Sequence, residues 1–437
     1  MIKVCKFGGS SLSCARQFAK VKDIVLSDSL RRVVVVSALG KRDSSDYKIT
    51  DLLYILHAHI KYNVDIENIW KLIYERFVDV RNELNIDFDI ESELANLHSK
   101  LNKNISEDFL VSRGEYLTAK LMSKYLGYEF VDACDIISFD FNGKLNETRT
   151  HDLTSAIDIT KKCIVVPGFY GSYPNKDIKI MSRGGSDITG SLLAEAFNAS
   201  VYENFTDVSG ILAADPRIVE SPKAIKEVTY QELSELSYMG ANVLHEDTVY
   251  PVQKFNIPIN IKNTNDPDNP GTIIKDDCTD TSSIVTGITG KKNYASITIS
   301  KSHMAGEIGN IRKALSIFEE YELSIDHVPS GIDSFSVVLP LSSIENLKYE
   351  LLSTLKEKLN ATIELDDDLA LISIIGRNMK NKKGVSGRLF TTLAENDINI
   401  KMMDQDPLEI SIIIGISNND YEKAIKVLYD SLVTNFN

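Results

Sequence analysis

The first forty residues alternate between strand-like and helix-like hydrophobic patterns. Residues 2–7 read as a strand, a glycine-rich turn follows at residues 8–11, and a helical stretch runs to about Leu26. Residues 32–37, Arg-Val-Val-Val-Val-Ser, then form a continuous apolar run. Such a run is typical of a strand buried on both faces of a parallel sheet. The pattern predicts a βαβ unit at the start of the chain.

Further along, the pattern separates a helical block from a series of strands. Apolar residues recur at three-and-four spacing through residues 51–126, which predicts helices covering one side of a sheet. Strand-like runs follow at residues 163–167, 200–204 and 257–262, separated by helical patterns such as residues 187–197. This alternation predicts an α/β domain over residues 1–280, with a largely parallel central sheet flanked by helices.

The last third of the chain contains an internal repeat. A polar stretch at residues 263–283 is the expected linker. After it, Ala-Ser-Ile-Thr-Ile at residues 295–299 recurs 75 residues later as Ala-Leu-Ile-Ser-Ile at residues 370–374. Each copy reads as a small βαββαβ sandwich, and neither contains a cluster of residues that would support catalysis. The repeat therefore predicts paired ligand or subunit sites.

Composition narrows the class of protein. The 437 residues are 43% hydrophobic and 25% charged, which indicates a globular protein of two or three domains. The net charge of −14 disfavours nucleic acid or an anionic membrane as a partner, so an anionic substrate would need a locally basic pocket. Five scattered cysteines without a C-x-x-C pair indicate reduced thiols. No leader or membrane-length apolar run is evident, and we expect a cytoplasmic protein.

The first candidate for chemistry is the turn Lys6-Phe7-Gly8-Gly9-Ser-Ser. Glycines let backbone N–H groups approach a phosphate, a helix start offers free donors, and a lysine supplies a charge for a transferring phosphoryl group. The spacing matches neither the P-loop nor the dinucleotide-binding pattern. Taken alone, a Gly-Gly turn is also a tight strand-to-helix connection.

A second glycine-rich loop opens a helix at Ser182-Arg183-Gly184-Gly185-Ser186-Asp187. An amino acid has an α-carboxylate that suits a bidentate arginine and an α-ammonium group that suits a carboxylate. One loop can therefore recognise both ends of a zwitterion. The structural alternative is a capped helix with a solvated arginine.

Two further segments are weaker candidates. The loop from Thr206-Asp207 to Asp215-Pro-Arg217 follows a strand, and ligands of open α/β sheets bind at that edge, so the loop suits a nucleotide. Asp-Pro-Arg is otherwise an ordinary turn. Glu115 lies in a mostly helical region, where an isolated glutamate is normally solvated.

Together and in this order, the motifs resemble those of the aspartate kinases of the amino-acid kinase family, over essentially the whole chain. The matching segments are K-F-G-G-S-S, V-V-V-S-A, S-R-G-E, V-V-P-G-F-Y-G, R-G-G-S-D, T-D-V-S-G-I-L-A-A-D-P-R and P-D-N-P-G-T. The repeat resembles the family's paired ACT domains, in which the first unit is inserted into the second. On that pattern residues 295–361 form the first unit, and residues 284–294 with 362–437 form the second.

The resemblance implies ATP, Mg²⁺ and L-aspartate as ligands, with the ion held mainly by phosphate oxygens and water and not by a protein ligand. Phosphoryl transfer would depend on Lys6, the amides of Gly8 and Gly9, and Asp187. The aspartate pocket would be shaped by Ser37, Thr50, Glu115, Arg183, Gly184, Gly185, Ser186 and Asp187, with Arg183 on the α-carboxylate and Asp187 near the α-ammonium group. The nucleotide side would be lined by Lys6, Phe7, Gly8, Gly9, Thr206, Asp207, Leu212, Asp215, Arg217, Asn242 and Val243.

The chain departs from the family pattern in three places. Asn242 stands where the family usually has a lysine near ATP, so that contact is expected to be weakened or replaced. Leu212 stands where a tyrosine or isoleucine is usual, and residues 405–409 read Gln-Asp-Pro-Leu-Glu in place of Gln-Gly-Ser-Ser-Glu. His245, in an apolar Val-Leu-His context, is expected to be structural.

The resemblance also implies regulation by an end-product amino acid, with homo-oligomer formation through the ACT domains. Lysine is the expected inhibitor, with threonine, alone or in concert with lysine, as the alternative. Candidate lining residues are Met304, Gly309, Ile311, Ser324, Ile325, Asp326 and Ser330, although Ile311 and Ile325 also suit core positions. No homoserine dehydrogenase segment is expected after the second unit. The alternatives are another carboxylate kinase of this fold, such as glutamate 5-kinase, and an amino-acid sensor without turnover.

Overall fold

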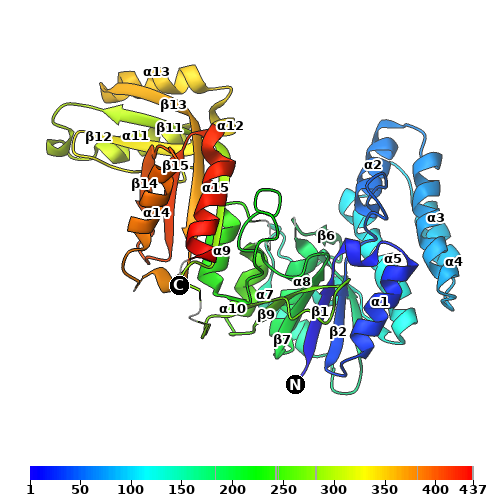
Figure 1. The fold of residues 1–437 in the computed structure, drawn as a ribbon. Coiled ribbons are helices and arrows are strands. Elements are labelled where there is room, and N and C mark those ends of the chain that lie inside the picture. The colour runs from blue at the N-terminus through cyan, green and yellow to red at the C-terminus, as the bar shows by residue number, and fades with distance from the viewer. Residues whose placement is uncertain (183, 242–243, 245, 281–282, 381, 436–437) are drawn as a thin grey trace. The chain divides into compact units, whose positions relative to one another are not determined.

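The computed structural model describes the chain except for residues 183, 242–243, 245, 281–282, 381 and 436–437 (Figure 1). The described chain forms two compact units. The first comprises Met1–Ile211, Ala224–Tyr230 and Val243–Cys278. The second comprises Leu212–Lys223, Gln231–Asn242 and Thr279–Asn437. Two segments of the expected 1–280 domain thus group with the C-terminal part of the chain.

The first unit is built on an eight-stranded sheet in the order β3-β4-β2-β1-β7-β9-β10-β8. The pairs are parallel except for β9 and β10, which confirms the predicted α/β fold. The strands are β1 (Lys3–Phe7), β2 (Arg31–Val36), β3 (Glu129–Phe130), β4 (Ile164–Pro167), β7 (Val201–Thr206), β8 (Glu227–Val228), β9 (Ile259–Asn263) and β10 (Thr272–Ile274).

The predicted linker at residues 263–283 was wrong in part. Its residues 272–274 form β10, which pairs with both β9 and β8. Thr272 is fully buried, and its hydroxyl donates to the carbonyl of Ile225. A three-residue strand within a polar stretch therefore extends the sheet.

Helices cover both faces of this sheet (Figure 1). The predicted helical block is confirmed as α2 (Ile49–Tyr62), α3 (Glu67–Glu83), α4 (Ile90–Ser99) and α5 (Glu107–Leu126), which share one apolar core with α1 (Ala15–Leu26). The 3₁₀ turn η1 (Gly9–Leu12) follows β1. The remaining elements of this unit are α6 (Ala133–Ile136), α7 (Glu147–Ser155), the hairpin β5 (Tyr170–Ser172) and β6 (Ile178–Ile180), α8 (Gly185–Ala196) and α10 (Glu246–Gln253).

The ends of α5 illustrate how the sequence sets an element. The hydroxyl of Ser106 accepts a hydrogen bond from the backbone N–H of Phe109 at 3.2 Å, which caps the first turn. Gly127 ends the helix with φ of 72°, in the left-handed region that favours glycine. Between these caps, α5 is buried along most of its length and packs against β4 and β2.

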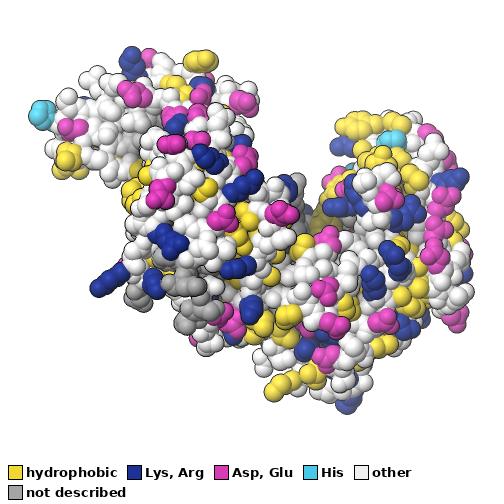
Figure 2. Space-filling model, viewed as in Figure 1, with side chains coloured by type: hydrophobic (Ala, Val, Ile, Leu, Met, Phe, Trp, Pro, Cys, Tyr) yellow, Lys and Arg dark blue, Asp and Glu magenta, His cyan; other side chains and the backbone are white. Residues whose placement is uncertain are grey.

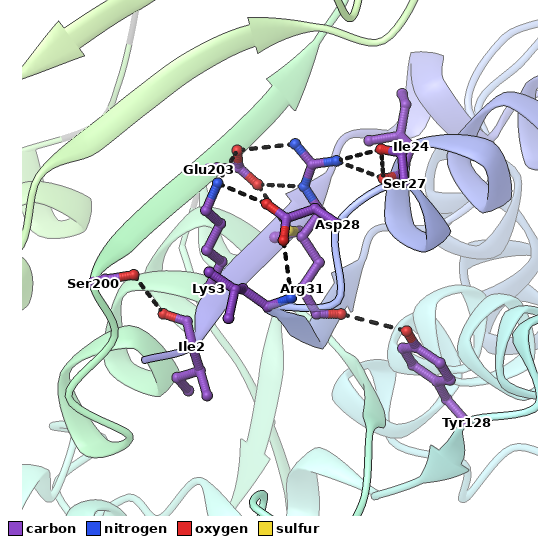
Figure 3. A network of polar contacts seen from close by, with 11 residues as sticks. Ile2, Lys3, Ile24, Ser27, Asp28, Arg31, Tyr128, Ser200 and Glu203 are labelled. Carbon is purple, nitrogen blue, oxygen red and sulfur yellow. Dashed lines mark hydrogen bonds and ion pairs between the residues drawn. The ribbon is translucent and has the colours of Figure 1, made fainter.

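A buried ion-pair network joins three strands of the first unit (Figure 3). Glu203 on β7 accepts from Arg31 Nε at 2.7 Å and Nη2 at 3.1 Å, while Lys3 Nζ lies 2.9 Å from Asp28 and 3.6 Å from Glu203. Burial acts to raise the pKa of Glu203, but the hydrogen bonds and charge of Arg31 outweigh it and hold that pKa below its usual value.

The second unit contains an antiparallel five-stranded sheet in the order β12-β11-β13-β15-β14. Its strands are β11 (Gly287–Ser300), β12 (Ser334–Pro340), β13 (Thr362–Ile375), β14 (Met402–Gln405) and β15 (Ser411–Ile416). Its helices are α9 (Tyr230–Tyr238), α11 (Asn310–Glu320), α12 (Leu341–Ile344), α13 (Lys348–Leu359), α14 (Val385–Glu395) and α15 (Tyr421–Tyr429).

The long strands β11 and β13 pair with each other along almost their whole length. Residues 294–300 of β11 also pair with β12, and residues 370–375 of β13 also pair with β15. Each copy of the sequence repeat therefore supplies one of the two central strands.

Two surface properties bear on function. Among the described helices, none is long and apolar enough to cross a membrane. On the face shown in Figure 2, basic and acidic side chains of the described residues are interspersed, and they form no continuous basic patch.

Candidate active site

The loops after the central strands of the first unit lie side by side. Gly8, Ser37 and Gly168 follow β1, β2 and β4, and each donates its backbone N–H to a carbonyl of the neighbouring strand at 2.9–3.1 Å. The carboxyl ends of parallel strands are where open α/β sheets bind ligands. This edge is therefore the candidate active site.

Two glycines make the closest approach at this edge. The N–H of Gly40 donates to the carbonyl of Gly9 at 2.9 Å. A Cβ on Gly40 would lie 2.3 Å from that carbonyl oxygen, so the loop after β2 accepts only glycine at this position. The Gly8-Gly9 turn is thus fixed against the neighbouring loop. The expectation that both glycine amides serve the phosphoryl group was wrong for Gly8, because its N–H is donated to Phe205, whereas the N–H of Gly9 has no partner among the described residues.

Three polar side chains meet beside this turn. Lys6 Nζ on β1 lies 2.6 Å from Asp187 Oδ1, in the first turn of α8. Asn204 on β7 accepts from Lys6 Nζ at 3.4 Å and donates through Nδ2 to Asp187 Oδ1 at 2.8 Å. Lys6 and Asp187, which the sequence placed in separate motifs, are therefore brought together.

The start of α8 follows from its glycines. Gly184 caps the helix with φ of 78°, and a Cβ on Gly185 would lie 2.8 Å from atoms of Phe169 and Met181. Ser186, next in the chain, is buried. The loop after β4 therefore packs tightly on the helix that carries Asp187.

Phe169, in that loop, has φ of 78°, an unusual value for a residue with a side chain. Its backbone N–H donates to the Thr189 hydroxyl at 3.1 Å, which helps to hold this conformation. Strained residues of this kind concentrate at functional sites, so Phe169 is a candidate that the sequence reading did not name.

Glu115 is not the solvated glutamate that its helical context suggested. It is 4% exposed, and its Oε2 is buried without a hydrogen-bond partner among the described residues. Burial raises the pKa of Glu115 to about 8, with a backbone hydrogen bond from Ala38 acting in the opposite direction. The packing explains the burial, because a Cβ on the adjacent Gly114 would lie 2.9 Å from the Ala38 side chain.

The other substrate candidates lie close to Glu115 along the chain or in space. Ser37 directly precedes Ala38 and is half-buried. Thr50, also half-buried, is in the first turn of α2. Ile49, the first residue of that helix, donates its N–H to the carbonyl of Leu39 at 3.1 Å. Ser37, Thr50 and Glu115 are therefore carried by segments that meet around residues 38–40.

Among the residues predicted for the nucleotide, Phe7 differs from Thr206 and Asp207 in where its side chain lies. The Phe7 ring is fully buried and stacks on Phe205 with centroids 4.8 Å apart, so this side chain belongs to the core. Thr206 ends β7, and its hydroxyl donates to Asp207 at 3.1 Å. Asp207 is exposed beyond the strand.

Leu212, Asp215 and Arg217 belong to the second unit. Arg217 donates to Asp215 through its backbone N–H at 2.8 Å and through Nη2 at 2.6 Å. These hydrogen bonds hold the pKa of Asp215 below its usual value, because they outweigh the opposing effect of burial. Leu212 is half-buried. Arg183, Asn242, Val243 and His245 lie outside the described residues.

The structure brings four of the seven effector candidates together. Met304, Gly309, Ile311 and Ser330 line a cavity of about 290 Å³ at the start of α11. Ile311 is 42% exposed, so the interpretation of Ile311 as a core residue was wrong.

Ser324, Ile325 and Asp326 are not in the lining of that cavity. Ile325 packs against the core of this part of the second unit, as the alternative reading predicted. Asp326 accepts a hydrogen bond from the Tyr294 hydroxyl at 2.7 Å. Ser324 is exposed.

Comparison with known proteins identifies the family. Residues 1–263 match the model of the amino acid kinase family, and residues 372–432 match an ACT domain. The chain is 36% identical to aspartokinase 3 of Bacillus subtilis over 98% of both chains.

Solved structures agree with this result. The crystal structure of Clostridium acetobutylicum aspartate kinase, an allosteric enzyme, superposes with a TM-score of 0.93 at 44% identity, covering 99% of this chain and 100% of that one. E. coli aspartokinase III, in complex with aspartate and ADP, gives 0.77 at 25% identity, covering 99% and 100%. The chain belongs to the amino acid kinase family and, within it, to the aspartokinases.

Proposed function

We propose that this chain transfers the γ-phosphoryl group of ATP to the side-chain carboxylate of L-aspartate, giving 4-phospho-L-aspartate and ADP. The observation that carries the proposal is the cluster of Lys6, Asp187 and Asn204 beside the Gly8-Gly9 turn, in a chain of this family. We also propose that the reaction takes place in the cytoplasm, as the first step of lysine, threonine and methionine biosynthesis.

The chemistry needs no nucleophile from the enzyme. The β-carboxylate of aspartate is ionised at neutral pH and attacks the γ-phosphorus in line, while the bond to the ADP oxygen breaks. Lys6 and the N–H of Gly9 neutralise charge on the transferring group, since the N–H of Gly8 is already donated to the carbonyl of Phe205. Mg²⁺ would enter with the nucleotide, held mainly by phosphate oxygens and water. Catalysis then rests on positioning and charge.

Recognition of aspartate would use opposite charges at its two ends. We assign the α-carboxylate to Arg183 and the α-ammonium group to the side of the pocket that holds Asp187 and Glu115. The raised pKa of Glu115 supports this assignment, because burial favours the neutral carboxyl group more than the charge of Arg113 favours the ionised one, and a bound ammonium group would shift the balance toward the ionised form. Ser37 and Thr50 would complete the pocket.

The remaining residues would serve the nucleotide. We assign Thr206 and Asp207, at the end of β7, to the ribose and phosphate side. Leu212, Asp215, Arg217, Asn242 and Val243 are proposed for the same ligand on the resemblance alone. Asp207 is exposed beyond β7, so its assignment can be tested by substitution.

The direct test is ADP release with ATP, Mg²⁺ and aspartate, repeated with glutamate in place of aspartate. We expect turnover with aspartate and at least tenfold less with glutamate, because the γ-carboxylate of glutamate is displaced by one methylene from the in-line position. Equal turnover with the two acids would reject aspartate as the specific substrate. No turnover with either would reject the kinase activity.

We further propose that an amino acid, lysine in the first instance, inhibits the enzyme through the second unit, which would also mediate homo-oligomer formation. The cavity at the start of α11 is large enough for an amino acid, and the neighbouring Ile308, Ile311 and Ile332 are exposed apolar residues that suit a subunit contact. E. coli aspartokinase III has been solved in complex with lysine and aspartate.

Inhibition can be tested by titrating lysine and threonine into the aspartate assay. We expect lysine to inhibit and Ser330→Leu, which fills the cavity, to weaken inhibition at least tenfold with basal turnover retained. Ser353→Leu, on the exposed face of α13, is the matched control and should be inhibited normally. Inhibition by threonine alone would change the effector, and unchanged inhibition of Ser330→Leu would move the site elsewhere.

A further inference from the structure

Asn204 has an unusual place in the sheet. It lies on β7 and is 3% exposed. In the parallel pairing of β1 with β7, it is the register partner of Lys6, whose partner on the other side is Val35 of β2. A polar amide in the middle of a buried parallel sheet is costly unless its donor and acceptor are both used.

Both ends of the Asn204 amide are used, and both by the active-site pair. Its Oδ1 accepts from the Lys6 ammonium group, and its Nδ2 donates to the Asp187 carboxylate. The assignment of oxygen and nitrogen follows from the partners, since an ammonium group only donates and a carboxylate only accepts. No apolar residue, and neither an ionised aspartate nor lysine, can make both contacts at this position.

The two contacts differ in length, and the difference points to what the amide does. The bond from Nδ2 to Asp187 is 2.8 Å, whereas Lys6 Nζ is 3.4 Å from Oδ1 and 2.6 Å from Asp187. Lys6 is therefore held chiefly by Asp187 and only loosely by the amide. When Lys6 turns to a phosphoryl group, Asp187 loses its cation but keeps the hydrogen bond from Asn204.

We infer that Asn204 is a positioning residue for phosphoryl transfer, which holds the Asp187 carboxylate in place so that Lys6 can move between it and the transferring group. This role rests on the proposed function. Asn204 touches no reacting atom, and it acts through the two side chains that it orients. An amide is suited to this role because it adds no charge to a site where the ammonium group must remain available.

The test compares Asn204→Leu with a matched control on the same strand. Tyr202 is fully buried, and its hydroxyl donates to the backbone carbonyl of Asp187 at 3.2 Å, so Tyr202→Phe removes a buried hydrogen bond to the same residue without touching its carboxylate. We expect Asn204→Leu to lower kcat about 10- to 100-fold, as for a misplaced catalytic group, with KM for ATP and aspartate within about threefold. Tyr202→Phe should keep kcat within about threefold.

Asn204→Asp, which is almost equal in volume, supplies a second readout if the leucine variant does not fold. Its carboxylate would face that of Asp187, and like charges this close raise the pKa of the pair. The protonated pair keeps a donor in place of Nδ2, so kcat relative to the parent should fall as pH rises from 6 to 9. A residue with only a structural role would not create this dependence.

The possible results distinguish a positioning role of Asn204 from a purely structural one. The positioning role would be supported if Asn204→Leu lowered kcat and the kcat of Asn204→Asp fell as pH rose. Neither change should be seen in Tyr202→Phe. Asn204 variants with the same kcat and pH profile as Tyr202→Phe would overturn it while leaving the proposed function intact. Absence of aspartate-dependent ADP release in the parent would overturn the proposed function, and this role with it.

Discussion

Two buried charged clusters share strands β1 and β7 of the first unit. One joins Arg31 and Glu203, with Lys3 and Asp28 beside them, and the other joins Lys6, Asp187 and Asn204. Glu203 and Asn204 are consecutive on β7, so their side chains point to opposite faces of the sheet. The Arg31 cluster contacts α1, and the Lys6 cluster contacts the start of α8.

The clusters differ in how completely the protein satisfies them. Arg31 and Glu203 are 9% and 4% exposed and make two hydrogen bonds to each other, so the pair is closed. Lys6 and Asp187 are 10% and 20% exposed and lie near the glycine turn at the ligand-binding edge. The difference indicates that a structural ion pair is saturated by its own partners, whereas the pair proposed for catalysis keeps capacity for a ligand.

The largest effect should come from breaking the closed cluster. Glu203→Ala leaves the buried Arg31 without its partner, and we expect the free energy of unfolding to fall by about 3–5 kcal/mol, measured by urea denaturation. The matched control is Glu129→Ala, which breaks an exposed pair with Lys162 and should cost under about 1 kcal/mol. Equal losses in the two variants would remove the distinction between the clusters.

The closed pair also predicts a dependence on acid. Because the folded-state pKa of Glu203 is lowered, its contribution to stability is present above its unfolded pKa and is lost as pH falls through the folded pKa. The stability difference between the parent and Glu203→Ala should therefore shrink in strong acid. A difference that stayed constant would show that the charge of Glu203 is not what stabilises the fold.

Next in size is Lys6→Ala in the open cluster. We expect kcat to fall by about 10²- to 10³-fold, as for loss of a preorganised donor to developing charge. Lys3→Ala removes a lysine from the same strand but from the closed cluster, so it should lower stability and leave kcat within about threefold. Near-normal turnover of Lys6→Ala would exclude Lys6 from the mechanism.

Glu115→Gln should have a smaller effect that depends on pH. The neutral amide can accept a hydrogen bond from an ammonium group but carries no charge to attract it, so we expect KM for aspartate to rise about tenfold. Because the folded-state pKa of Glu115 is raised, ionising this group destabilises the folded protein increasingly as pH rises above the unfolded pKa. The melting temperature of Glu115→Gln should therefore exceed that of the parent by a margin that grows up to about pH 8.

A half-buried carboxyl group supplies the control for Glu115. Glu195, also in the first unit, has its pKa raised by burial and is 15% exposed. Glu195→Gln should leave KM for aspartate unchanged. If both glutamine variants raised KM equally, Glu115 would have no specific place in the pocket.

The smallest effect should come from replacing the whole closed pair. Arg31→Met combined with Glu203→Leu removes both charges together, so neither is left unpaired, and the free energy of unfolding should return to within about 1 kcal/mol of the parent. Turnover should not change. A double variant no more stable than Glu203→Ala would mean that the network has a role that apolar packing cannot replace.

Much of this fold follows from local pattern. The four-valine run of β2, the glycine turn after β1 and the three-and-four spacing of α2–α5 each predict an element without knowledge of its neighbours. Lys6 and Asp187 could be nominated because each lies in a glycine-rich motif at a strand end or helix start. Periodicity and turn chemistry act over a few residues, and a sequence reading can use them directly.

The features that local pattern did not predict depend on contacts between segments that are far apart in the chain. Glu115 could be named only through the resemblance, and its burial has no local signal, because it follows from the approach of α5 to Ala38 at Gly114. Asn204 stands inside a strand without a motif, and only its register with Lys6 gives it meaning. β10 is three residues long, too short for a period to show. All three features belong to the tertiary structure, because they follow from which segments of the chain pack together.

The long strands β11 and β13 set a limit on how the C-terminal repeat could be divided. They pair with each other along almost their whole length, so cutting out residues 295–361 would remove residues 295–300 of β11 and the strand β12 that pairs with them. Residues 362–366 of β13 would then be left without their strand partners. An exposed strand edge of this kind is prone to aggregation. A gene fragment encoding one repeat copy is therefore expected to give an insoluble product, and protein engineering of the regulatory half has to exchange both copies as one piece.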